Sequence, residues 1–230
     1  MKKFELTSEF VTFLGKKFFR IKALVAFGDV KEGELGGFVE KEENLDQSGD
    51  AWVSGNAQVF GDAWVSGNAQ VFGDAQVSGD ARVFGDAQVF GDAQVSGNAR
   101  VFGDARVSGN ARVFGDAWVS GNAWVSGNAR VSGNARVFGD ARVFGDAQVF
   151  GDAHIQCCRD CSAASCFGSE NRTTTFFREK DGGIGVRCGC FYGTMSEFRE
   201  KVKERHEDSR LAKEYLMLAD LMEFRLSKDE

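Results

Sequence analysis

A six-residue repeat occupies residues 51 to 152 without an insertion or a deletion. Its unit is Ala-x-Val-y-Gly followed by Asp or Asn, and it occurs seventeen times in succession. A fixed period determines the architecture of a chain before local propensities matter. An eighteenth, degraded unit begins at Ala153 and ends in Cys157 and Cys158. The repeat therefore constrains the fold of nearly half of the chain.

The spacing within each unit predicts a short strand and a sharp bend. Ala and Val are two residues apart, so on a strand both point to one side while x and y point to the other. The Gly-Asp or Gly-Asn pair supplies the bend. Four strand residues and a two-residue turn are too short for a crossover through a helix, but they suit a triangular coil of three units. We expect a mainly β fold, a parallel β-helix.

The bends are expected to need positive φ angles. The chain has 29 glycines and no proline, and glycine adopts positive φ at little cost. We interpret the ten Asp and seven Asn of the repeat as turn residues that tolerate positive φ. Stacked acidic corners could also imitate a nucleic-acid backbone, but the seven Arg of the repeat argue against this alternative.

The predicted organisation has three parts. Residues 1–50 form an N-terminal cap, with strands over Phe4 to Phe13 and Phe18 to Phe27 around a turn at Gly15. Leu35 to Val39, followed by Leu45, forms an imperfect first coil. Residues 51–156 form the β-helix. Solenoid ends expose unpaired strand backbone, so both need a cap.

Residues 157–230 form the third part, a C-terminal cap and oligomerisation region. Thr173 to Phe177 and Gly185 to Phe191 predict a hairpin around Asp181-Gly182-Gly183. Thr194 and Glu197 have the spacing of a capping box that opens a helix. A second helix is expected to start near Asp208 or Ser209, with Leu211, Tyr215, Leu218 and Met222 on one face.

Function is expected on the outward side of the coils, because a Val and Ala interior leaves no room for a ligand. Nine Phe and four Trp occupy outward positions of the repeat, more apolar surface than a soluble monomer normally exposes. We expect a homotrimer or a partner to cover part of it. The alternative is that the rings stack along their own columns with Arg over their faces. The predicted binding surface consists of Trp52, Trp64, Trp118, Trp124, Phe72, Phe84, Phe90, Phe102, Arg82, Arg100, Arg106 and Arg136.

The net charge and hydropathy of the chain argue against two classes of partner, nucleic acids and membranes. The formal net charge is −6, so a nucleic-acid partner is disfavoured. No apolar run approaches the roughly 18 residues of a membrane span, and the first residues turn acidic before a signal core develops. We expect a cytoplasmic protein with no membrane association and no cofactor.

The units resemble the hexapeptide-repeat family, which has an aliphatic residue at its first position and a small one at its fifth, here Val53 and Ala57. The resemblance implies a left-handed winding and trimers with parallel axes. Acyltransferases of this family use a histidine as general base in a subunit cleft. His154 is the one matching candidate for a catalytic residue, although no loop interrupts the repeat, and a surface or cap histidine is the favoured interpretation. A related trimeric carbonic anhydrase would need three metal-binding histidines, and the chain has two.

The six cysteines all lie in the last third of the chain. Cys157, Cys161, Cys188 and Cys190 could supply four thiolates to a structural zinc if their segments meet. Neither the spacing of Cys157 and Cys161 nor that of Cys188 and Cys190 is the usual C-x2-C. We therefore favour reduced thiols in the cap and no metal.

Both ends of the chain resemble a group of bacterial and phage hexapeptide-repeat proteins, through the segments Leu35 to Leu45, Thr173 to Phe177 and Cys188 to Thr194. The resemblance implies a phage or prophage protein in the host cytoplasm. We favour a non-catalytic protein that holds a host protein or a small ligand and could block a defence factor. The alternatives are a CoA-dependent acyltransferase and a component of a particle or filament.

Overall fold

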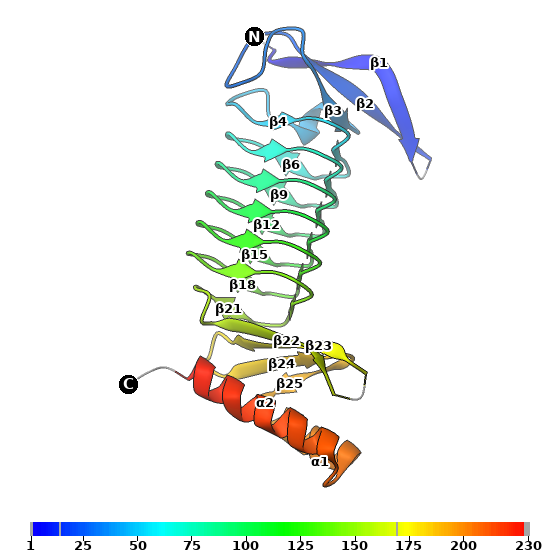
Figure 1. The fold of residues 1–230 in the computed structure, drawn as a ribbon. Coiled ribbons are helices and arrows are strands. Elements are labelled where there is room, and N and C mark those ends of the chain that lie inside the picture. The colour runs from blue at the N-terminus through cyan, green and yellow to red at the C-terminus, as the bar shows by residue number, and fades with distance from the viewer. Residues whose placement is uncertain (1, 14, 169, 228–230) are drawn as a thin grey trace.

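A computed structural model describes residues 2–13, 15–168 and 170–227 (Figure 1). The repeat forms a parallel β-solenoid of about seven turns, with one sheet on each of its three faces. A β-hairpin projects from the N-terminal end, and a small sheet with two helices closes the C-terminal end. The predicted mainly β fold with a parallel β-helix is confirmed, and its left-handed sense stays a prediction.

Each repeat unit contributes one two-residue strand, and strands one coil apart pair in register. We name the faces by their outward residues. The Trp118 face contains β6 (Trp64–Val65), β9 (Arg82–Val83), β12 (Arg100–Val101), β15 (Trp118–Val119), β18 (Arg136–Val137) and β21 (His154–Ile155). The Trp124 face contains β4 (Trp52–Val53), β7 (Gln70–Val71), β10 (Gln88–Val89), β13 (Arg106–Val107), β16 (Trp124–Val125) and β19 (Arg142–Val143). The Gln face contains β3 (Leu35–Val39), β5 (Gln58–Val59), β8 (Gln76–Val77), β11 (Gln94–Val95), β14 (Arg112–Val113), β17 (Arg130–Val131) and β20 (Gln148–Val149).

Backbone hydrogen bonds between coils hold the solenoid together. The N–H of Arg100 donates to the Ala117 carbonyl at 2.9 Å, and the N–H of Phe102 donates to the Val119 carbonyl at 3.0 Å. The same pattern recurs along all three faces. Every repeat Ala and Val is at most 3% exposed. The interior is therefore a stack of small aliphatic side chains, which leaves the outward side for recognition.

The N-terminal cap begins with the hairpin of β1 (Phe4–Phe13) and β2 (Lys16–Ala23). The second strand ends four residues before the predicted Phe27. β2 also pairs antiparallel with β3, which in turn pairs parallel with β5. A 3-10 turn, Glu42–Asn44, leads to a parallel bridge between Leu45 and Val65. These pairings extend the parallel sheets of the solenoid to Leu35–Val39 and Leu45.

The C-terminal cap is a four-stranded antiparallel sheet of β22 (Cys161–Phe167), β23 (Arg172–Arg178), β24 (Ile184–Cys188) and β25 (Phe191–Thr194). The hairpin of β23 and β24 is confirmed. The predicted strand Gly185 to Phe191 was wrong, because Gly189 adopts a φ of +57° and splits it in two. The sequence did not predict β22, whose small residues show no alternation of hydropathy.

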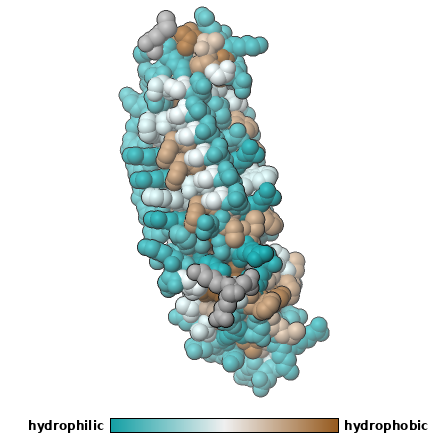
Figure 2. Space-filling view, turned by 90° about the vertical axis from the view of Figure 1, so that its left-hand side faces the viewer, coloured by the Kyte–Doolittle hydropathy of each residue, from teal (hydrophilic) through white to brown (hydrophobic). Residues whose placement is uncertain are grey.

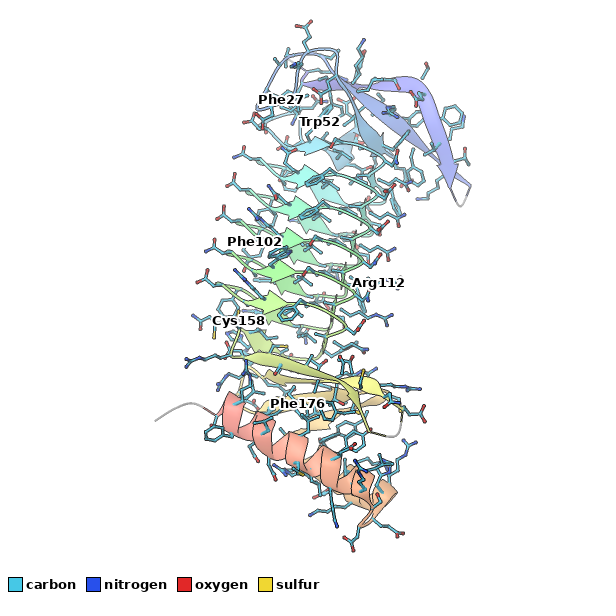
Figure 3. All side chains as sticks on the ribbon, in the orientation of Figure 1. Phe27, Trp52, Phe102, Arg112, Cys158 and Phe176 are labelled. Atoms are coloured by element: carbon cyan, nitrogen blue, oxygen red, sulfur yellow. The ribbon has the colours of Figure 1, made fainter. Side chains whose placement is uncertain are left out.

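The small sheet separates two cores. Phe177 packs on the solenoid core. Phe176, labelled in Figure 3, packs on the helices α1 (Met195–His206) and α2 (Arg210–Leu226). Both helix starts are confirmed, with Thr194 and Glu197 forming the capping box and Ser209 capping α2. The sheet also caps exposed backbone, since the Gln148 N–H donates to Thr175 Oγ1 at 2.9 Å.

The corner glycines satisfy two constraints at once. From Gly55 to Gly151, each repeat glycine has a φ between +62° and +74°. A Cβ at Gly109 would lie 3.1 Å from the nitrogen of Gly127 in the next coil. The repeat Asp and Asn residues do not have positive φ. Their interpretation as positive-φ residues was therefore wrong, because glycine alone makes the bend.

Substitutions at two glycines of one corner column distinguish the strain of a positive φ from the steric contact with the next coil. Gly109→Ala should lower the free energy of unfolding by about 1–2 kcal/mol because of its positive φ. The contact with Gly127 should lower it by roughly 1–3 kcal/mol more. Gly145→Ala should lose only the first part, since Gly145 has a similar φ of +66° but no atom within 4 Å of an added Cβ. Guanidinium unfolding of both variants measures the difference. Equal losses would contradict the close stacking of the coils.

Candidate functional site

The structure places the outward residues in the predicted columns. Arg100 pairs with Trp118, and Trp118 pairs with Arg136, each 18 residues apart. Arg82 and His154 extend the same column at its two ends. The predicted surface residues Trp64, Phe84 and Phe102 also belong to the Trp118 face. Arg106, Trp124, Phe72 and Phe90 lie on the Trp124 face.

Trp52 was predicted to lie on the exposed binding surface, and this prediction was wrong. Its side chain is only 2% exposed because the N-terminal cap covers it. The rings of Phe4 and Phe27 lie edge-on to it, with centroids at 6.5 and 5.4 Å. Phe27 and Trp52 lie next to each other at the N-terminal end in Figure 3. Trp52 therefore joins the cap to the first coils and is removed from the candidate surface.

Trp118 lies between two arginines at the centre of its face. The guanidinium carbons of Arg100 and Arg136 are 5.1 and 4.7 Å from the centroid of the Trp118 ring. Both distances are in the range of cation–π attraction. The ring of Phe102 adds an edge-on contact at 6.1 Å, and Phe84 stacks parallel to Phe102 at 5.0 Å. The neighbours hold these side chains in place before any partner binds.

Stacking along the columns covers part of the outward aromatic surface. On the Trp124 face, the rings of Phe72 and Phe90 lie parallel at 4.8 Å. Trp124 donates its indole N–H to Ser108 Oγ at 2.9 Å. However, Trp64 and Trp124 remain 38% and 39% exposed, and Phe144 is 66% exposed. Figure 2 shows the hydrophobic atoms in separate groups along the solenoid, among hydrophilic ones.

A recess of about 440 Å³ lies on the Trp118 face toward the C-terminal cap. Arg100, Trp118, Arg136 and His154 line it from the strands, and Lys180 lines it from the cap. Two carboxylates, of Asp116 and Asp152, belong to its corner. Three cations against two carboxylates give the recess a mixed, polar character, with one aromatic ring at its centre. Such a surface favours recognition through Trp and Arg.

The corner residues have a structural role of their own. Asn98 Nδ2 donates to Asp116 Oδ1 at 2.9 Å, and Asn134 Nδ2 donates to Asp152 Oδ1 at 3.0 Å. All seven repeat Asn donate in this way to the residue 18 positions later, which is Asp in six cases. The amides thus link neighbouring coils and orient the carboxylates of the recess.

His154 lies in the recess but makes no contact that indicates catalysis. Its ring is half-buried and lies edge-on to Phe138 at 4.7 Å. The acyltransferase interpretation stays a prediction. The other histidine, His206, ends α1 and stacks on Tyr215 at 5.6 Å.

The structure does not bring the four candidate zinc ligands together. Cys157 precedes the cap sheet, Cys161 begins β22, Cys188 ends β24 and Cys190 lies in the turn before β25. Within residues 2–13, 15–168 and 170–227, no group of three or more His, Cys, Asp or Glu side chains could hold a metal.

The Cys161 thiol packs against the solenoid core. Burial, together with the charge of Asp160, raises its pKa to about 12. Burial alone would raise the pKa of Asp160, but the N–H groups of Gln156 and Cys157 and the Arg178 guanidinium hold it below its usual range. Cys161 is therefore an unreactive thiol beside a charged carboxylate.

Comparison with known families supports the architecture. A family model described as YdcK Beta solenoid repeat matches residues 75–92, 93–106, 105–121, 123–137, 129–145 and 135–151. No curated protein matches the chain. Together with the three parallel sheets, the match supports a β-solenoid built from sequence repeats. No helix of the described chain has the length and hydropathy that a membrane span requires.

Thiol labelling tests the placement of the cysteines. At pH 8, iodoacetamide should modify the exposed Cys158, Cys166 and Cys190 first. Cys161 should react at least roughly tenfold more slowly, because its raised pKa keeps it protonated. Peptide mass spectrometry measures each rate, and labelling in denaturant provides the control in which the difference disappears. Equal rates for Cys161 and Cys158 in the folded protein would show that packing against the core does not shield the Cys161 thiol.

Proposed function

We propose that this β-solenoid is a non-catalytic binding protein that holds a protein partner on its Trp118 face. The observation that carries the proposal is the stack of Arg100, Trp118 and Arg136 beside an open polar recess. Trp and Arg are the residue types that most often dominate the energy of protein interfaces. Here they are held in position by the coils above and below, which reduces the entropy lost on binding.

The surroundings of the stack also favour a protein partner. The face is a sheet of short strands whose outward residues are regularly spaced, so it offers an extended surface. The recess provides donors from Arg100, Arg136 and Lys180 and acceptors from Asp116 and Asp152. A protein surface can match both kinds of group, together with the ring of Trp118. A simple polyanion would be repelled by the corner carboxylates.

A phage or prophage origin gives the proposal a concrete form. The ends of the chain resemble bacterial and phage hexapeptide-repeat proteins, which supports a product that acts in the host cytoplasm. The partner would then be a host defence factor that is blocked by occupation of one of its surfaces. An account of this kind needs no catalytic residue.

A homotrimer is the second part of the proposal. Trp124 and Phe144 are the exposed aromatics of the Trp124 face, and contact with neighbouring copies would remove both from water. Light scattering should give three times the chain mass for the wild type. Phe144→Ser should shift the protein toward the monomer, whereas Phe102→Ser on the Trp118 face should not. A wild-type monomer at high concentration would contradict this part.

The binding proposal is tested with two matched double variants. Trp118→Ala with Arg136→Ala removes the centre of the stack, and Arg112→Ala with Arg130→Ala removes two exposed arginines from the Gln face. Native purification from host cells, followed by mass spectrometry, identifies and quantifies what remains bound. We expect the partner with the wild type and the Gln-face control, and at least roughly tenfold less with the Trp118-face variant.

Two results would contradict the proposal. One is equal recovery of the partner with both variants, which would place binding elsewhere. The other is a wild-type protein that retains nothing from host lysate. Thermal unfolding of both variants checks that the loss is local, since neither substitution touches the Val and Ala interior.

A further inference from the structure

A second hollow lies in the C-terminal cap, away from the Trp118 face. It has a volume of about 430 Å³ and opens between the turn joining β24 to β25 and the helices α1 and α2. We call it the cap pocket. Phe191, Phe198 and Val202 line its inner wall, and Arg172, Lys201 and Arg205 line its rim. Its volume is in the range of roughly 300–1,000 Å³ that small-molecule sites occupy.

The inner wall of the cap pocket is apolar. Phe191 and Phe198 lie with ring centroids 5.6 Å apart, and Phe198 lies edge-on to Tyr215 at 5.9 Å. Phe198, Val202 and Tyr215 are buried members of the cap core. Cys188 completes the wall, with its sulfur accepting a hydrogen bond from Thr174 at 3.2 Å. The wall is therefore built from packed side chains of the sheet and both helices.

The rim of the cap pocket is positively charged. Arg172, Lys201 and Arg205 surround it, with Glu170 as the one carboxylate among the lining residues. Arg172 contacts Glu170 at 3.6 Å, and Lys201 contacts Glu204 at 2.7 Å. Arg205 makes no ion pair with a described residue. A cationic rim is unexpected in a chain with a net charge of −6, and it complements an anion.

We propose that the cap pocket binds a small carboxylate with an apolar body, of the type of a free medium-chain fatty acid. The apolar body would be removed from water against Phe191, Phe198 and Val202, which is favourable in proportion to the apolar area buried. The carboxylate would remain at the rim and accept hydrogen bonds from Arg205 and its neighbours, which is the chemistry that guanidinium groups favour. The site is independent of the Trp118 face.

The test uses decanoate as the probe and the full-length chain, with binding followed by isothermal titration calorimetry. Cys190 is an exposed wall residue, so Cys190→Trp fills the pocket from its mouth without disturbing the core. Cys158→Trp is the matched control, because Cys158 is also exposed but lies outside the pocket. We expect decanoate to bind the wild type and the control alike, and Cys190→Trp at least roughly tenfold more weakly.

Two further measurements separate the rim from the wall. Arg205→Ala should weaken decanoate binding several-fold, whereas Lys203→Ala, on α1 but outside the pocket, should not. Decan-1-ol, which has the same chain and no charge, should bind the wild type roughly tenfold more weakly than decanoate. No binding of decanoate at millimolar concentration would overturn the proposal. Equal binding by the Cys190→Trp and Cys158→Trp variants would overturn it as well.

Discussion

The close approach of glycine backbones at each corner is the constraint on which the rest of the structure depends. Each bend needs a positive φ, and at most of these positions a Cβ would lie in tight contact with the backbone of the next coil. Because the coils then stack at the spacing of paired strands, every residue meets its equivalent 18 positions later. Residues at equivalent repeat positions therefore form columns along the solenoid. Val and Ala form the interior columns, Asn and Asp form the linked corners, and the outward positions are free to vary.

Interior and outward positions of the repeat therefore have different roles, structural for the first and functional for the second. The interior leaves no space for a ligand, so recognition falls to the outward columns and to the ends. Outward rings gain contacts from their own column, as Phe84 does from Phe102, and Arg side chains cover ring faces, as at Trp118. The columns are consequently both a stabilising feature and a preorganised surface. The C-terminal cap adds a different kind of site, because its helices enclose space that the solenoid cannot.

The period of the sequence was sufficient to predict the solenoid, the column of each outward residue and the need for glycine at the bends. Local signals were sufficient for the helix starts at Thr194 and Ser209. Trp52 was misplaced because its burial depends on Phe4 and Phe27, which reach it only through the tertiary fold of the cap. The role of the repeat Asn was missed because it depends on the neighbouring coil. The cap pocket was also missed, since β22 and the positions of Cys188, Arg172 and His206 follow from packing that no local pattern shows.

Hydroxyl-radical footprinting of the purified complex tests most directly whether the Trp118 face is the recognition surface. The method measures how accessible individual Trp and Phe side chains are, with and without the bound partner. Binding at the proposed face predicts that the partner protects Phe84, Phe102, Trp118 and Phe138, which recur along a single face of the solenoid. Phe60 and Phe114 on the Gln face should be unchanged. Protection confined to the N-terminal hairpin or the C-terminal helices, with Trp118 still oxidised at its free rate, would contradict the account.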